Sequence, residues 1–171
     1  MKRRLCSLLT AVLLTFSVLL AASPAVVFAG SNSDVIFSYL TSELGLNSAA
    51  ACGIMGNIYQ ECTMNPDAAG SSYYGICQWG GSRLSNLRAY CEEHGFSSSS
   101  LEGQLGYLRY ELENCYTGTL DYLCNVENSY EGAYNAAVYF CTNFEQPGNL
   151  SWENATRGSY AADMFWPEYG A

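Results

Sequence analysis

The sequence predicts a mainly α-helical domain that is interrupted by one irregular loop or small hairpin. Apolar residues recur at helical spacing through most of the chain. Residues that cap helices, mainly Ser, Asn and Asp, precede these runs, and Gly or Pro residues follow them. Only residues 62–81 hold too many Gly, Ser and Tyr residues for a helix. The remainder is long enough for about seven helices around one core.

The first two helices are expected over residues 35–44 and from Asn47 or Ser48 to about Glu61. Gly45 ends the first helix. The second is rich in small residues, which are Ala49, Ala50, Ala51, Gly53 and Gly56. Glycine inside a helix costs about 1 kcal/mol relative to alanine. Two interior glycines therefore predict that another element packs closely against this helix.

Five further helices are expected in the second half of the chain. Each begins at a capping or apolar residue and ends near a Gly, a Pro or a polar turn. They cover about residues 82–93, 101–116, 119–126, 129–144 and 151–165. The sequence contains no internal repeat and no sign of a second domain.

The N-terminal residues 1–29 have the features of a signal peptide. Three basic residues at positions 2–4 precede an apolar run over residues 8–22, and small residues surround Phe28. We expect cleavage after Ala29, which leaves residues 30–171 as one exported domain. A retained N-terminal anchor is the alternative, although the run is short and interrupted for a membrane span.

The charge of the expected mature chain is strongly negative. Without the three basic residues at positions 2–4, four arginines stand against sixteen acidic residues, a formal net charge of −12. Such a surface repels nucleic acids and anionic membranes, so neither is an expected partner. The acidic excess is most simply a device for solubility.

Seven cysteines lie outside the expected signal peptide: Cys52, Cys62, Cys77, Cys91, Cys115, Cys124 and Cys141. No CxxC pair or suitably spaced histidine accompanies them, so the sequence predicts no metal site. In an oxidising compartment we expect most of them to form disulfide bonds. The number is odd, and Cys77, in an apolar and aromatic turn, is the candidate for the unpaired thiol.

Glu61 is the candidate catalytic residue. A carboxyl group at the C-terminal end of a helix meets the negative end of the macrodipole, which disfavours its ionised form. Apolar surroundings act in the same direction, so the group could stay protonated and serve as a general acid. The alternative is an ordinary solvated carboxylate near a helix end.

Several segments together resemble the phage tail lysozyme family, a group of lysozyme-like peptidoglycan hydrolases. These are AAACGIMGNIYQEC, NPDAAG, YGICQWGGSR, QLGYLRYEL and FEQP, and the resemblance extends over about residues 35–161. The resemblance implies a lysozyme-like fold and cleavage of the β-1,4 glycan backbone of peptidoglycan. It assigns the catalytic glutamate to Glu61 and the loop glutamine to Gln78. Cys62 departs from the pattern, in which a small Ser or Gly commonly follows the glutamate.

A second carboxyl group is common in glycosidases. The candidates are Asp67, close in sequence, and the remote Glu111 and Glu145. For each of them a surface or structural role is the favoured interpretation, and some lysozyme-like enzymes work with one glutamate alone. Glu145 is expected to form an ion pair with one of three arginines, Arg83, Arg88 or Arg157.

Gln78, Tyr74 and Trp79 are the expected substrate-binding residues. An amide can both donate to and accept from a sugar, and aromatic faces stack on pyranose rings. For Trp79 the favoured alternative is a place in the core of the turn. His94, the only histidine, fits a helix C-terminus, where its charge complements the dipole. A Cys–His peptidase that uses His94 is a remote alternative.

The sequence thus predicts a secreted, monomeric glycosidase that acts on peptidoglycan glycan strands without a cofactor. A catalytically silent glycan-binding wall module on the same fold is the first alternative, and a chitinase-like glycosidase is the second. Whether the products carry hydrolysed or anhydro ends, as from a lytic transglycosylase, stays open.

Overall fold

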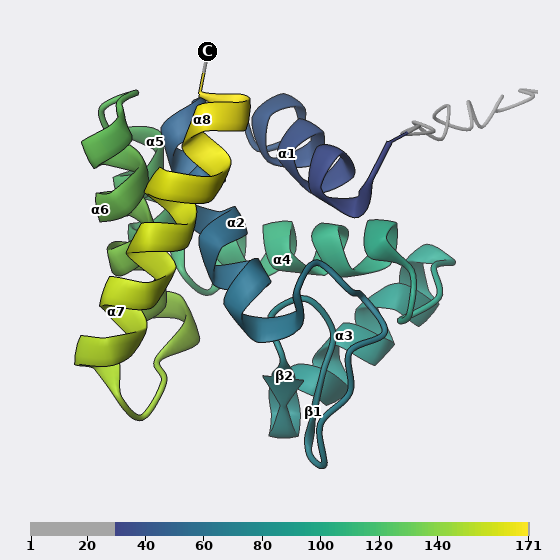
Figure 1. Ribbon diagram of the computed structural model, residues 1–171. Coiled ribbons are helices and arrows are strands. Elements are labelled where there is room, and N and C mark those ends of the chain that lie inside the picture. Colours follow the sequence, from purple (N-terminus) through teal and green to yellow (C-terminus); the bar gives the residue numbers. More distant parts are fainter. Residues whose placement is uncertain (1–29, 171) are drawn as a thin grey trace, which may run out of the picture.

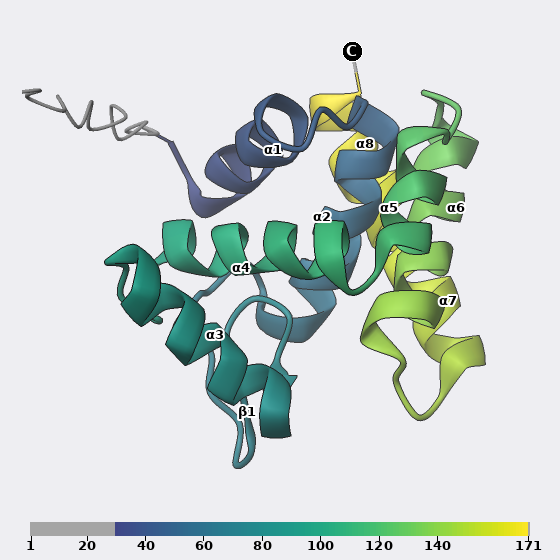
Figure 2. The same ribbon diagram turned by 180° about the vertical axis from the view of Figure 1, so that it is seen from behind.

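Helix α2 (Ser48–Cys62) is the central element of the structure, a computed structural model that describes residues 30–170. Figures 1 and 2 show α2 between two groups of elements: α5 to α8 on one side, and α1, α3, α4 and the hairpin on the other. Every residue of α2 from Ala49 to Ile58 is buried. The close packing predicted from its small residues is present.

The described residues are mainly helical, as the sequence predicts. The other elements are α1 (Asn32–Ser42), β1 (Tyr73–Tyr74), β2 (Trp79–Gly80), α3 (Gly81–His94), α4 (Leu101–Asn114), α5 (Thr117–Cys124), α6 (Tyr130–Phe140), the π-helical segment η1 (Cys141–Glu145), α7 (Leu150–Ser159), the π-helical segment η2 (Tyr160–Phe165) and α8 (Trp166–Tyr169). No helix within residues 30–170 is long and apolar enough to cross a membrane.

Two glycines of α2 let neighbouring helices approach at backbone distance. A Cβ atom on Gly53 would lie 2.5 Å from the Cβ of Ala136 and 2.8 Å from the backbone nitrogen of Ala137, both on α6. A Cβ atom on Gly56 would lie 2.6 Å from the carbonyl oxygen of Arg157 on α7. These contacts bring α6 and α7 directly against α2.

The irregular stretch after α2 closes with a small hairpin. Its two strands are antiparallel, and Tyr73 pairs with Gly80 and Tyr74 with Trp79. Gln104 of α4 holds the connection: its Oε1 accepts a hydrogen bond from the Ile76 backbone at 2.9 Å. Its Nε2 donates to the carbonyl oxygens of Pro66 and Ser98, each at 2.8 Å. The fully buried side-chain amide of Gln104 therefore fixes the position of the loop.

The last two helices that the sequence predicts each contain a widened, π-helical segment that the sequence does not predict. The helix expected over residues 129–144 consists of α6 and η1, and the helix expected over residues 151–165 consists of α7 and η2. Widened turns of this kind are rare and often occur at functional sites. The first of them ends at Glu145.

The predicted disulfide bonds are absent from the described residues, and this expectation is corrected. All seven described cysteines are free, with Cys115 and Cys124 exposed and the other five buried. The buried ones fill space in helices and turns as small apolar residues. Cys77 is thus one of seven unpaired thiols and is not a single unpaired one. The predicted signal peptide, residues 1–29, lies outside the described residues.

The glycine contact between α2 and α6 can be tested by adding one methyl group. Gly53→Ala should lower the free energy of unfolding by about 1–3 kcal/mol, because the new Cβ overlaps the α6 backbone. Gly118→Ala on α5 is the matched control, since no atom lies within 4 Å of the position that its new methyl group would take. The control should be neutral or slightly stabilising. Urea unfolding curves measure both, and equal stabilities of the two variants would contradict the packing.

Candidate active site

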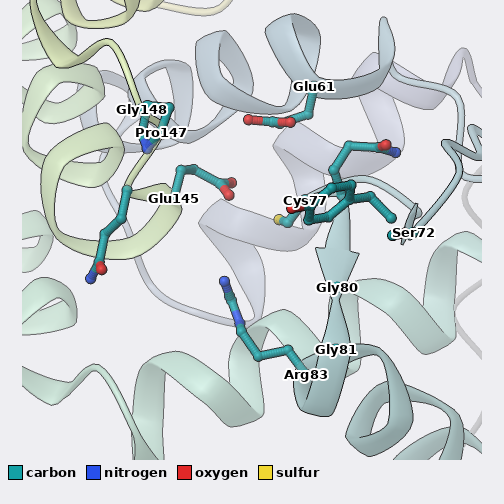
Figure 3. A pocket seen from close by; sticks show the side chains of 12 residues that line it. Glu61, Ser72, Cys77, Gly80, Gly81, Arg83, Glu145, Pro147 and Gly148 are labelled. Carbon is teal, nitrogen blue, oxygen red and sulfur yellow. The ribbon is translucent and has the colours of Figure 1, made fainter.

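Glu61 lies in the last turn of α2 and lines a pocket of about 670 Å³. The pocket lies between the end of α2, the hairpin, the start of α3 and the end of η1. Figure 3 shows the side chains of Glu61, Cys77, Arg83 and Glu145 directed toward a common space. The full lining is Glu61, Ser72, Tyr73, Cys77, Gln78, Gly80, Gly81, Arg83, Glu145, Gln146, Pro147 and Gly148.

The carboxylate of Glu61 is held by Arg157 of α7. One guanidinium nitrogen, Nη2, donates to Glu61 Oε1 at 2.6 Å. The other two nitrogens donate to Asn57 Oδ1 at 3.2 Å and to Glu153 Oε2 at 2.9 Å. Burial by itself lowers the pKa of Arg157, but the charge and hydrogen bond of Glu61 outweigh it, and the net direction is upward. Arg157 therefore supplies a fixed positive charge beside Glu61, and the apolar surroundings expected for this carboxyl group are wrong.

Glu145 faces the same pocket and has no ion-pair partner. The expected pairing with an arginine is wrong: within residues 30–170, no basic side chain lies within 4 Å of its carboxyl group, and Arg157 pairs with Glu61 and Glu153 instead. Arg83 pairs with Glu111. Although the residue keeps some exposed surface, its Oε1 atom is buried without a hydrogen-bond partner in the described part of the chain.

The surroundings of Glu145 favour its neutral form. Burial, followed by the negative charge of Glu61, raises the pKa of Glu145 to about 8. The positive charges of Arg157 and Arg83 and a hydrogen bond donated by the Cys77 thiol lower the pKa but do not cancel the increase. The pocket thus holds two carboxyl groups in unequal environments, one beside a cation and one without.

Glu111 has a structural role, as the favoured interpretation holds. It is 3% exposed and accepts two hydrogen bonds from Arg83, at 2.8 and 2.7 Å. It also accepts from Trp79 Nε1 at 2.8 Å and from the Tyr107 hydroxyl at 3.1 Å. Because both oxygens are occupied, this carboxylate ties α3, α4 and β2 together and is not free to act on a ligand.

Two of the expected substrate-binding residues lie elsewhere. Tyr74 does not line the pocket and donates its hydroxyl to the exposed Asp67 at 3.0 Å. Its neighbour Tyr73, which is 57% exposed, lines the pocket in its place. Trp79 has no exposed surface and belongs to the core. Tyr74 and Trp79 thus lie outside the lining of this pocket, Trp79 has the core position that was the favoured alternative for it, and Asp67 is a surface carboxylate.

Gln78 lies in the pocket wall, where the sequence predicts a ligand-binding amide. Its Nε2 donates to the carbonyl oxygens of Ala68 at 3.1 Å and Gly75 at 2.9 Å. The amide nitrogen thus braces the loop. The amide oxygen carries no hydrogen bond from residues 30–170 and is available as an acceptor.

Unusual backbone conformations gather around the pocket. The non-glycine residues with positive φ in the described range are Thr63, Met64, Gln78 and Gln146. Thr63 and Met64 follow Glu61 closely, and Gln78 and Gln146 line the pocket. Such conformations cost of order 1–3 kcal/mol each and cluster at functional sites. Their position supports a functional role for this pocket.

His94 is remote from this chemistry. It occupies the last turn of α3, as predicted, with its ring 4.1 Å from that of Tyr90. It does not line the pocket with Cys77, so the Cys–His peptidase arrangement is not formed. Within residues 30–170, no group of three or more His, Cys, Asp or Glu side chains is placed to hold a metal ion.

Residues 31–166 match the family model of phage tail lysozyme, which covers most of the chain and its pocket. The chain belongs to the phage tail lysozyme family. No curated protein matches it. The family assigns a lysozyme-like fold, which agrees with the helical structure, and implies lysozyme-like glycosidase activity on peptidoglycan.

Two features of this phage tail lysozyme domain escape prediction from the sequence. The first is Arg157, whose contact with Glu61 spans 96 residues and leaves no local signal. The second is the unpaired state of Glu145. The composition gives one indication of this state. Because four arginines cannot pair with sixteen acidic residues, some carboxyl groups must lack an ion-pair partner, and Glu145, next to the apolar Phe144, can be one of them.

The raised pKa of Glu145 predicts a pH-dependent stability. A carboxyl group whose folded pKa is about 8, against an ordinary value of 4.5, stabilises the fold fully below pH 4.5, and this contribution is lost as pH rises through 8. The amide that replaces the carboxyl group in Glu145→Gln cannot titrate. The melting temperature of the wild type should therefore fall relative to that of Glu145→Gln between pH 4.5 and 8.

Thermal unfolding followed by circular dichroism at several pH values measures this difference. Glu92→Gln, at an exposed carboxylate on α3, is the control and should melt in parallel with the wild type. Parallel curves for Glu145→Gln as well would contradict a neutral Glu145.

Proposed function

We propose that this protein cleaves the β-1,4 glycan backbone of peptidoglycan with Glu61 as the general acid. The observation that carries the proposal is the placement of the family's helix-end glutamate in the pocket wall, beside a buried cation. A pocket of about 670 Å³ is within the usual range for small-ligand sites.

The chemistry follows from the groups around Glu61. The bond between C1 and the bridging O4 breaks as Glu61 gives its proton to O4. The negative charge of the carboxylate that remains is stabilised by the guanidinium of Arg157 at 2.6 Å, so the arginine stabilises the product side of the proton transfer. The other pocket groups are suited to sugar binding: the amide oxygen of Gln78 can accept from a hydroxyl or an N-acetyl N–H, and the exposed ring of Tyr73 offers a stacking face.

We further propose that the protein acts outside the cell as a secreted monomer. The support is the basic and apolar pattern of residues 1–29, followed by small residues before Gly30. Peptidoglycan lies outside the cell membrane, so export and a wall substrate are consistent with each other. The two alternatives are a silent glycan-binding module on the same fold, which cuts nothing, and a chitinase-like enzyme, which cuts chains of N-acetylglucosamine.

Replacement of Glu61 tests the proposed function. Glu61→Gln keeps the shape of the side chain but removes the transferable proton, so digestion of purified sacculi should slow by about 10²–10⁴-fold. Glu92→Gln should retain full activity. Release of soluble fragments measures the rate, and circular dichroism checks that each variant is folded.

Parallel digestion of sacculi and chitin separates the alternatives. Mass spectrometry of the released ends identifies the cleaved bond and tells reducing from anhydro termini. A silent module releases nothing from either polymer, and a chitinase-like enzyme prefers chitin. Undiminished activity of Glu61→Gln would show that another residue is the acid.

A further inference from the structure

Glu145 and Glu61 are the only two carboxyl residues among those that line the pocket in the described chain. They come from separate elements, Glu61 from α2 and Glu145 from η1. Figure 3 shows both carboxyl groups directed into the space between these elements. The widened turn of η1, closed by a hydrogen bond from the Gln146 nitrogen to the Cys141 oxygen at 2.8 Å, sets the position of Glu145.

The two cations whose charges act on Glu145, Arg157 and Arg83, form their ion pairs with other carboxylates. Arg83 binds Glu111 through Nε and Nη2, and its guanidinium carbon lies 4.5 Å from the centre of the Phe144 ring. The three guanidinium nitrogens of Arg157 donate hydrogen bonds to Glu61, Glu153 and Asn57. Glu145 is thus placed at the pocket without the ion pair that a structural carboxylate would have.

A carboxyl group with no ion pair and with one buried oxygen that lacks a hydrogen-bond partner is costly and needs a reason. If Glu145 only filled space, an amide or apolar side chain would do so without this cost. A second carboxyl group beside a catalytic glutamate is, in contrast, what glycoside cleavage commonly uses.

We propose that Glu145 is the second catalytic carboxyl group of this pocket and acts with Glu61 as one acid–base pair. The proposal rests on the proposed function. It gives a catalytic role to a residue for which the sequence favours a structural ion pair.

The pair gives a balanced reaction. Glu61 donates its proton to O4 as the C1–O4 bond breaks. The oxygen that attacks C1, from water or from a hydroxyl of the same sugar, forms the new bond and loses its proton to Glu145. The pair therefore holds one proton before and after the reaction, and the transfer of that proton back to Glu61 resets the site.

The environment of the two groups in the structure matches the end of this cycle. Glu61 accepts a hydrogen bond from the guanidinium of Arg157, while Glu145 has a buried oxygen without a partner. The groups that face Glu145 are Glu61 from α2, Cys77 from the hairpin loop, Arg83 from α3 and Arg157 from α7. Together they leave its pKa at about 8, so the pair keeps its proton at neutral pH and loses it above pH 8.

The test compares initial rates on purified sacculi from pH 5 to 9 for the wild type, Glu145→Gln, Glu61→Gln and the double variant. The wild-type rate should fall as pH rises through about 8, since the pair then has no proton to donate. Glu145→Gln should be at least about 10²-fold slower near neutral pH and should lose this alkaline fall. Groups that act as a unit are not additive, so the double variant should be about as slow as the slower single variant.

A structural role for Glu145 predicts a different pattern. Glu145→Gln would then lower stability or the folded fraction, keep the alkaline fall and combine multiplicatively with Glu61→Gln. An active Glu145→Gln with an unchanged pH profile overturns the pair and leaves the proposed function standing. A wild type that releases no glycan fragments overturns both.

A titration on the folded protein tests the pair without turnover and without reliance on a well-folded active variant. Carbon-13 NMR of labelled glutamate carboxyl groups should show one titration near pH 8 in the wild type. That midpoint should fall in Glu61→Gln, because the repelling charge is removed. An absent or unmoved midpoint overturns the coupling.

Discussion

The structure depends on the contacts that the buried guanidinium of Arg157 makes with α2. Arg157 is 2% exposed and binds Glu61 and Asn57 on α2 and Glu153 one turn earlier on its own helix. Removal of one partner from a buried ion pair commonly costs about 3–5 kcal/mol, because the other charge is left without compensation. The group that orders the candidate acid is therefore also the group that joins α7 to the central helix. Fold and site share one electrostatic contact, and neither can be altered alone.

The scarcity of cations decides the state of the other carboxyl groups. Two of the four arginines of the expected mature chain are partly or fully buried near the pocket, and both form their ion pairs with carboxylates other than Glu145, namely Glu61, Glu111 and Glu153. Glu145 is the acid that remains, and it is driven toward its neutral form. An acidic composition, which looks like a device for solubility, thus has a consequence inside the site. The interior has more carboxyl groups than positive charges to compensate them.

Much of the fold could be predicted because its signals are local. Asn47 and Ser129 cap helices as expected, each accepting a hydrogen bond from the backbone three residues on. Gly95 ends α3 with a φ of +75°, a conformation that glycine adopts without strain. The position of Glu61 at a helix end followed from the same kind of signal.

The remaining features depend on distant contacts. The widened turns η1 and η2 interrupt runs whose apolar spacing is still helical, so their sequence does not distinguish them. In the hairpin, adjacent residues of a strand face opposite sides. A difference of one residue therefore places Tyr73 at the pocket and Tyr74 against Asp67, a choice that only the strand register settles. The ion pairs of Arg83 and Arg157 likewise join elements far apart in sequence.

The family motif GIMGNIYQE is best understood as one face of α2. Gly53, Gly56, Asn57 and Glu61 recur at helical spacing and so point to the same side. Gly53 admits α6, Gly56 admits the backbone of Arg157, and Asn57 binds both the Arg157 guanidinium and the Ala137 carbonyl. Gly56 therefore contacts the backbone of Arg157, and Glu61 accepts a hydrogen bond from the guanidinium of the same residue. The spacing of the motif is therefore the spacing needed to bring a buried cation from α7 to the carboxylate that closes α2.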